Sequence, residues 1–296
     1  MIDYALVAGS FLVAIVVGLT GMGGGALMTP MMMLFFNVPP LAAVSSDLVA
    51  SAVMKPVGGA VHLRRGTVNL RLVGWLCAGS VPAAFCGVFV ARAFAVTDGV
   101  KYALGVALLL AVAGMAAKSW LGSRAGEGGA PGAQEIVVRP IPTLLVGTVG
   151  GLVVGVSSVG SGSLIIVALL ALYPALKANQ LVGTDLVQAV PLVAAAALGH
   201  LMFGDFRMEL TLSLLIGSIP GVYLGARISS RAPGGLIRAL LAIVLLASAL
   251  KLLGVHDQVT LVAVGAAALA AAAGWQWRVR GAARASREST DLARVR

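Results

Sequence analysis

The stretch Gly18–Pro30, "GLTGMGGGALMTP", interrupts an apolar run with five glycines between residues 18 and 25. Glycine weakens a helix interior by about 1 kcal/mol relative to alanine, so this density of glycine inside an apolar segment needs a physical reason. Three are open at first: a nucleotide-binding loop, a surface for close helix packing, or a break in a membrane helix. The rest of the chain distinguishes among them.

The composition is that of a membrane protein. Of the 296 residues, 59% are hydrophobic and 11% are charged, against roughly 25% charged in soluble domains. The runs 236–253 and 259–275 are close to the roughly 18 apolar residues that suggest a spanning helix. The net charge of +10 does not indicate nucleic acid, because the basic residues cluster in short loops and in the tail 278–296. We therefore predict an all-α integral membrane protein surrounded by the lipid bilayer, with no nucleic-acid partner.

The apolar segments form two groups of five and one extra. We expect them at 3–20, 25–36, 41–62, 70–91, 99–120, 140–156, 162–173, 179–203, 208–229, 235–254 and 258–277. This order predicts a first membrane repeat (1–121), a cytoplasmic linker (122–139), a second membrane repeat (140–256), an extra C-terminal transmembrane helix (257–277) and a basic cytoplasmic tail (278–296). Some segments are short or re-entrant and are broken at glycine-rich loops.

The two groups are related by an internal repeat. Alignment of the first half with the second pairs "VSSDLVA" (44–50) with "VGTDLVQ" (182–188) and "GSVP" (79–82) with "GSIP" (217–220). Between residues 44 and 87, 13 of 44 positions are identical to their counterparts, and they include Asp, His and Pro. The glycine-rich opening stretch joins the repeat with its register shifted by one position, so that Gly25 aligns with Gly162. The sequence therefore predicts two structurally similar halves.

The positive-inside rule predicts that the halves are inverted. We expect the protein in the cell (inner or plasma) membrane, with its C-terminal tail on the cytoplasmic side. The basic loop 64–71 is then also cytoplasmic, whereas its counterpart near Gly204 lies on the opposite side of the membrane. The stretch 25–36 is too short for a membrane-spanning helix, but a re-entrant pair and a twice-spanning pair return the chain to the same side. The predicted orientation is therefore independent of how the short segments lie.

Two acidic residues lie deep in apolar segments, and they are repeat equivalents: Asp47 and Asp185. A charge at mid-membrane costs about 2.5–3.5 kcal/mol on insertion scales, so it usually faces a cavity or a partner. Each aspartate caps its helix or makes a structural pair, or it couples transport to an ion or proton, and these roles do not exclude each other. Gln188, one turn after Asp185, belongs to the same set of coupling or structural polar groups.

Lys55 is the basic residue inside an apolar segment, and Pro56 follows it, so a cation lies beside a helix irregularity. This arrangement suits a bound anion, and the alternative is a Lys55–Asp47 pair without substrate contact. His62 and His200 lie near the ends of their segments, where we expect solvated interfacial histidines.

A glycine-rich break occurs in both halves, before a short segment. The first lacks the Gly-Lys-Ser/Thr ending of a phosphate-binding loop, which argues against nucleotide binding. A broken membrane helix exposes backbone N–H groups and a positive helix end, which bind anions. The predicted substrate-binding residues are Lys55 and those of the two breaks: Gly21, Met22, Gly23, Gly24, Gly25, Ser157, Ser158, Gly160, Ser161, Gly162 and Ser163.

The chain resembles the TauE/SafE family of sulfite and organosulfonate exporters over about residues 5–255. The resemblance lies in "GLTGMGGGALMTP", in "SSDLVAS" and in their second-half echoes. It implies a secondary carrier that moves small anions such as sulfite or sulfoacetate outward, driven by an ion gradient.

An anion channel is the alternative within transport, and an integral membrane enzyme is the alternative outside it. The Cys and His residues show no metal-ligand spacing, and no nucleophile–base constellation is apparent. We therefore expect no catalytic residue, no metal site and no cofactor. A small anion is the expected partner, and the sequence is compatible with a homodimer.

Overall fold

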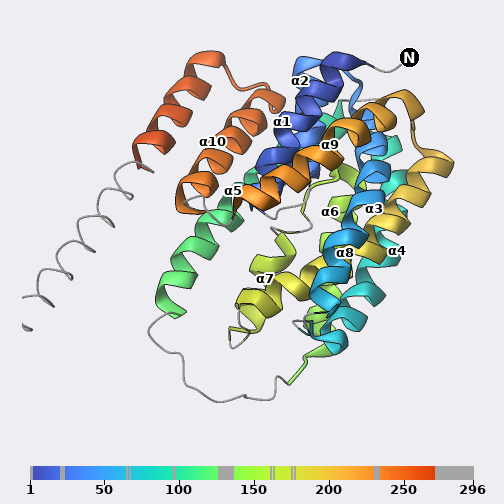
Figure 1. Ribbon diagram of the computed structural model, residues 1–296, viewed down its shortest axis with the longest axis vertical. Helices are drawn as coiled ribbons and strands as arrows, with labels where there is room; N and C mark the ends of the chain where they lie inside the picture. The colour runs from blue at the N-terminus through green and yellow to red at the C-terminus, as the bar shows by residue number, and fades with distance from the viewer. Residues whose placement is uncertain are drawn as a thin grey trace, which may run out of the picture.

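The computed structural model describes residues 3–20, 24–64, 66, 68–95, 98–125, 137–160, 162, 164–174, 176, 178–229 and 234–270, and every regular element in these ranges is an α-helix. Ten helices follow one another along the chain (Figure 1): α1 (Tyr4–Thr20), α2 (Gly25–Phe35), α3 (Pro40–Arg64), α4 (Leu70–Ala95), α5 (Gly99–Ala125), α6 (Pro140–Ser157), α7 (Leu164–Leu172), α8 (Ala178–Phe203), α9 (Met208–Ser229) and α10 (Gly234–Leu252). A further helix, Asp257–Ala270, follows α10.

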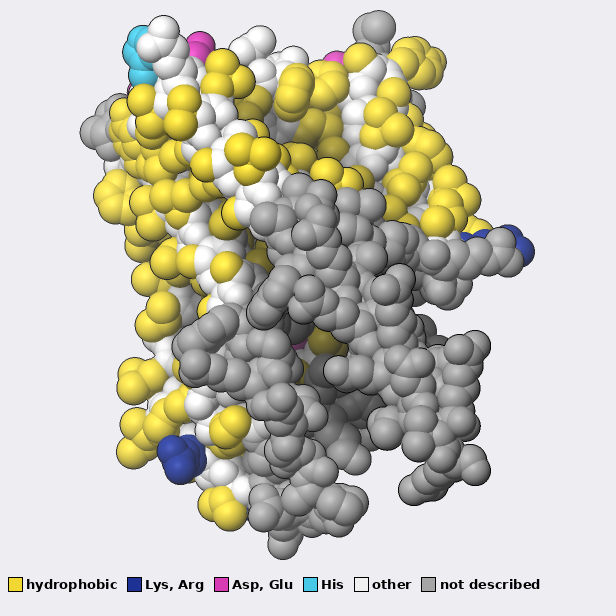
Figure 2. Space-filling view, turned by 90° about the vertical axis from the view of Figure 1, so that its left-hand side faces the viewer, with side chains coloured by type: hydrophobic (Ala, Val, Ile, Leu, Met, Phe, Trp, Pro, Cys, Tyr) yellow, Lys and Arg dark blue, Asp and Glu magenta, His cyan; other side chains and the backbone are white. Residues whose placement is uncertain are grey.

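Five of the described helices are long and apolar enough to cross a membrane: α4, α5, α6, α8 and α9. Helices satisfy their own backbone hydrogen bonds, which is what the hydrocarbon interior demands. Large apolar side chains also point outward, including Leu12, Val149 and Tyr223. Hydrophobic side chains cover most of the coloured surface in Figure 2, and charged ones are few there. The fold is that of a multi-pass membrane protein, as the sequence predicts.

The first helix of each half packs along the fourth helix of the other half, so that α1 lies along α9 and α6 lies along α4. Gly79 of α4 lies against the backbone of Leu144 in α6. Its repeat equivalent, Gly217 of α9, lies against the backbone of Val7 in α1. Val7 and Leu144 are themselves repeat equivalents, in the register that aligns the two glycine-rich breaks. The two interhalf contacts are therefore copies of each other, and both depend on a residue without a side chain.

The equivalent helices α3 and α8 pack against each other in opposite directions. Ser45, near the start of α3, contacts His200, near the end of α8. Gly59, near the end of α3, contacts Leu186 and Val190, in the first half of α8. Repeats of parallel topology would make equivalent helices run the same way. The antiparallel pair therefore has the geometry that an inverted repeat requires.

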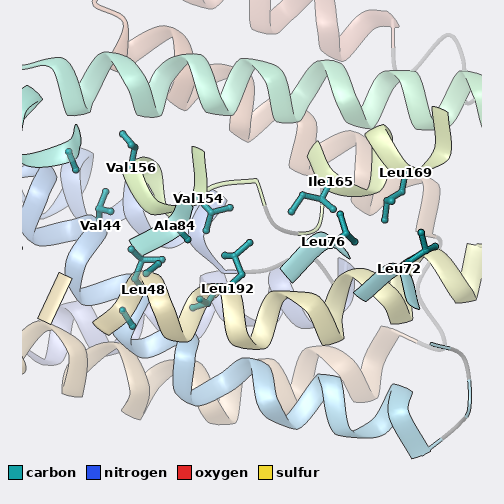
Figure 3. Packing of buried hydrophobic residues seen from close by; sticks show 14 of the residues in the cluster. Val44, Leu48, Leu72, Leu76, Ala84, Val154, Val156, Ile165, Leu169 and Leu192 are labelled. Atoms are coloured by element: carbon teal, nitrogen blue, oxygen red, sulfur yellow. The ribbon is translucent and has the colours of Figure 1, made fainter. Parts of the chain in front are cut away.

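The largest hydrophobic cluster lies between the halves. Figure 3 shows Val44 and Leu48 of α3 near Val154 of α6 and Leu192 of α8, with Ile165 of α7 in the same cluster. Because helices of both halves contribute to this cluster, neither half buries its apolar face alone.

The observed helix ends differ from the expected segments by a few residues. α5 continues to Ala125, beyond the expected end at 120. α2 and α7 have 11 and nine residues, or about 16 Å and 14 Å at the helical rise, and are too short to cross about 30 Å of hydrocarbon. Most of the predicted linker and all of the predicted tail lie outside the described residues.

Candidate functional site

The two glycine-rich breaks meet inside the molecule. The first lies between α1 and α2, and the second follows Ser157 at the end of α6. Gly25, the first residue of α2, lies so close to Ser158 that a Cβ atom on it would clash with the Ser158 carbonyl and hydroxyl groups. The N-terminus of α2 therefore contacts the second break directly. The structure thus brings together Gly25 and Ser158, which the sequence assigns to the same site.

The second break is fixed by its backbone. Ser158, Gly160 and Gly162 have φ angles of 59°, 125° and 98°, and this left-handed region stops the helix and favours glycine. The Ser157 hydroxyl donates to the Val153 carbonyl at 2.7 Å, and the Val159 N–H donates to the Ser157 hydroxyl at 3.2 Å. Ser157 therefore helps to end α6, whereas the Ser158 hydroxyl points to another partner.

That partner is Asp47, whose side chain is fully buried. Its Oδ2 accepts hydrogen bonds from Thr29 Oγ1 at 3.0 Å and from Ser158 Oγ at 2.6 Å. Its Oδ1 is buried and has no hydrogen-bond partner among the described residues. The carboxylate thus joins α2, α3 and the second break. Sequence reasoning missed Thr29, although it stands one helical turn after Gly25 on α2.

The capping hypothesis is wrong for both aspartates. α3 begins at Pro40 and α8 begins at Ala178, so Asp47 and Asp185 each lie seven residues inside their helices. An N-cap side chain accepts hydrogen bonds from the free N–H groups of the first turn, which are out of reach from that position. Asp185 is 1% exposed, so both carboxyl groups are polar groups of the helix interior.

Lys55 is partly buried in α3. Its ammonium group interacts electrostatically with both Asp185 and Asp47. The repeat equivalent of Lys55 is Val193, so the second half supplies no matching cation. One basic side chain therefore balances two carboxylates from different halves.

Gln188 makes a second polar contact between the halves. Its Nε2 donates to Ser80 Oγ of α4 at 2.7 Å, and its buried Oε1 has no hydrogen-bond partner among the described residues. The repeat equivalent of Ser80 is Ser218, and that of Gln188 is Ala50. Ser218 Oγ is accordingly buried without a hydrogen-bond partner within the described ranges. The halves therefore share a backbone plan but differ in polar chemistry.

His200 is fully buried, so the expectation of a solvated interfacial histidine is wrong for it. Its Nε2 donates to the Gly155 carbonyl at 2.7 Å, and its Nδ1 lies 2.8 Å from Ser45 Oγ. α3 and α6 cover this end of α8 and supply both partners. The counterpart His62 is partly buried, and the position that matches Ser45 is Gly183, which offers no hydroxyl group.

The remaining predicted binding residues divide into two sets. Gly24 lies next to the side chains of Met28 and Met54, and Gly160 lies next to those of Leu164 and Val154, so both have apolar neighbours. The other set lies outside the described residues: Gly21, Met22, Gly23, Ser161 and Ser163.

The assembled site combines a helix N-terminus, hydroxyl groups, two carboxylates and one ammonium group at membrane depth. Such groups bind and release small ions, and protons exchange on carboxylates. Among the described residues, no group of three or more His, Cys, Asp or Glu side chains is placed to hold a metal ion. A separate cavity of about 220 Å³ lies at the ends of α4 and α8, between Pro40, Phe94 and Asp205, and it shares no residue with the breaks.

Comparison with known proteins agrees with this architecture. Residues 6–252, from the first turn of α1 to the end of α10, match the family described as "Sulfite exporter TauE/SafE". "Probable membrane transporter protein YjnA" of Bacillus subtilis (strain 168) is 35% identical over 249 residues, which cover 81% of this chain and 96% of that protein. "Probable membrane transporter protein YdhB" of the same organism is 22% identical over 229 residues, 75% of this chain and 89% of that protein. No solved structure matches the chain significantly. The chain therefore belongs to the sulfite exporter TauE/SafE family, a family of membrane transporters.

Proposed function

We propose that the protein is a secondary transporter that exports small sulfur-containing anions, such as sulfite or a sulfonate like sulfoacetate. We further propose that it resides in the cell membrane with its C-terminus in the cytoplasm. The observation that carries the proposal is the contact between the N-terminus of α2 and Ser158 of the second break. The description of the family supports a sulfur oxyanion as the substrate.

The chemistry of the site suits an oxyanion. The N-terminus of α2 presents backbone N–H groups and the positive end of its helix dipole. Thr29 and Ser158 add hydroxyl donors, and Lys55 adds a positive charge at membrane depth. The three oxygens of sulfite or of a sulfonate can each accept a hydrogen bond from a different donor, so a site with several donors suits them better than a site with a single cation. The glycine-rich breaks thus serve anion binding in this proposal.

Transport by pure wild-type protein in proteoliposomes tests the function. Radiolabelled sulfite or sulfoacetate should accumulate against its concentration gradient when an ion gradient is imposed. Equilibration without uphill accumulation would support an anion channel instead, and absence of flux for the whole panel of sulfite, thiosulfate, sulfoacetate, isethionate and sulfate would contradict both.

The role of Lys55 is testable with a matched variant. Lys55→Ala should reduce flux at least tenfold, because it leaves two carboxylates near the site without their shared cation. Lys251→Ala is the control, since it removes the same charge from an exposed pair with Asp257. Normal flux in Lys55→Ala would remove this residue from the mechanism.

A further inference from the structure

The hydroxyl donors at the meeting point of the breaks are already in use. Thr29 Oγ1 and Ser158 Oγ both donate to Asp47 Oδ2, at 3.0 Å and 2.6 Å. Gly25, at the positive end of α2, lies directly against Ser158. A carboxylate of the protein therefore holds the donors that an incoming oxyanion would need.

The arrangement at Asp47 is unbalanced. Both hydrogen bonds reach Oδ2, whereas Oδ1 is buried and has no hydrogen-bond partner among the described residues. A buried carboxylate oxygen without a donor costs free energy, because the group has left water without compensation. A proton on this carboxyl group removes its negative charge. The hydrogen bonds from Thr29 and Ser158 to Asp47 are then weaker.

The residues equivalent to Thr29 and Ser158 differ in the other half. In the register that aligns the two breaks, Ser158 corresponds to Gly21 and Thr29 corresponds to Ile166. The positions that correspond to Ser158 and Thr29 therefore carry no hydroxyl group, and Lys55 is the neighbour of Asp185 across the α3–α8 contact. Equivalent positions in the two halves thus carry different chemistry.

Few charged groups surround Asp47. α2, α6 and α7 contain no titratable side chain. α4 carries Arg71, Cys77, Cys86 and Arg92, and α5 carries Lys101, Tyr102, Lys118 and Arg124. The titratable groups on the other elements around Asp47 are Lys55, His62 and Arg64 on α3, Asp185 and His200 on α8, and Glu209, Tyr223 and Arg227 on α9, which Arg207 precedes. Asp47 is thus the titratable group that contacts the hydroxyl donors of the two breaks.

We propose that Asp47 is an internal competitor of the substrate, so that the anion binds only when Asp47 takes up a proton. This inference rests on the proposed function and names its coupling ion. A proton from solution binds to the Asp47 carboxylate, and the O–H groups of Thr29 and Ser158 turn from Oδ2 to the oxygens of the substrate. On release, the proton leaves and the carboxylate recaptures both hydroxyl groups. One proton therefore accompanies each anion, so export proceeds when the outward gradient of the anion outweighs the inward gradient of protons.

The test measures anion binding and proton uptake together on purified, detergent-solubilised protein. Isethionate and sulfate are the probes, because neither changes its charge between pH 5.5 and 8. In the wild type, affinity should fall by up to about tenfold per pH unit as Asp47 ionises, with close to one proton taken up per anion bound in weakly buffered solution.

Asp47→Asn is the decisive variant, and Asp257→Asn, which changes an exposed aspartate paired with Lys251, is its control. Asp47→Asn should bind the probes with the same affinity across the pH range and without proton uptake, whereas Asp257→Asn should keep both the pH slope and the proton. Thr29→Val, which keeps the shape of the side chain, should weaken binding at low pH but leave the slope unchanged.

The outcomes separate the two proposals. Anion binding by the wild type that is independent of pH, or a pH slope that survives in Asp47→Asn, would overturn the competitor role while leaving anion transport intact. Absence of anion binding at every pH in the wild type and in Asp47→Asn would overturn the proposed function itself, and the competitor role with it.

Discussion

At the scale of single residues, the site depends on contacts between groups far apart in the sequence. Asp47 binds Thr29 of its own repeat and Ser158 of the other. Asp47 could be predicted, because a buried acid repeated in both halves needs a reason. Thr29 could not, because its place relative to Asp47 depends on where α2 begins and on how α2 packs against α3. A single hydroxyl group on a Met-rich apolar helix does not by itself indicate a binding residue.

We predict that Gly25→Ala impairs both stability and transport. The added Cβ would meet the backbone carbonyl of Ser158, which is not a flexible side chain and can yield only if the second break moves. The expected destabilisation is about 1–3 kcal/mol, measured by chemical unfolding in detergent. Gly74→Ala is the control, because a Cβ there meets nothing within 4 Å. Unchanged stability in Gly25→Ala would contradict the close approach of the two breaks.

His200→Gln should destabilise the protein, because it disturbs the buried hydrogen bonds with Ser45 and the Gly155 carbonyl. Leaving such groups partly unsatisfied costs about 1–3 kcal/mol. His62→Gln at the equivalent position should have an effect within about 0.5 kcal/mol, because His62 is partly exposed to its surroundings. Thermal unfolding of both variants in the same detergent checks the difference, and equal effects would argue against a structural role of His200.

At the scale of helices, the apolar pattern of the sequence is enough to predict which helices exist and in what order they follow one another. A run of apolar residues in hydrocarbon has no alternative to a helix, so the segments could be placed within a few residues. Their ends depend on local backbone geometry instead: the left-handed Ser158 and the glycines after it stop α6, whereas α5 continues through Gly122 to Ala125. Helix directions followed from the repeat, but the partner of each helix did not, because α1–α9 and α4–α6 contacts join different halves.

The glycines of these interhalf contacts give a paired prediction. Gly79→Ala and Gly217→Ala each place a Cβ against the backbone of a helix from the other half, so both should lower the melting temperature by similar amounts. Gly265→Ala, on the helix after α10, meets nothing within 4 Å and serves as the control. Melting curves recorded by scanning fluorimetry measure the effect. A strong effect in one variant and none in the other would contradict the equivalence of the two contacts.

At the scale of the whole molecule, the two halves combine one backbone plan with unequal chemistry. Antiparallel packing of α3 and α8 follows from the inverted repeat. The positions equivalent to Lys55, Thr29 and Ser158 carry Val193, Ile166 and Gly21. The backbone arrangement is therefore shared by the two halves, whereas the charged and hydroxyl side chains of the site are not. The sequence shows which equivalent positions carry different residues, but only the contacts in the structure show what those residues bind.

The inverted orientation makes a final prediction about which side of the membrane each loop faces. In a variant without Cys77 and Cys86, single cysteines at Arg64, at the end of α3, and at Asp205, after α8, mark two equivalent loops. Both positions are solvent-accessible in part or in full. A membrane-impermeant maleimide added to intact cells should label the cysteine at 205 and spare the one at 64, because the basic loop stays in the cytoplasm. Disruption of the cells should expose both. Labelling of both cysteines in intact cells, or of neither, would show that the halves are not inverted across the membrane.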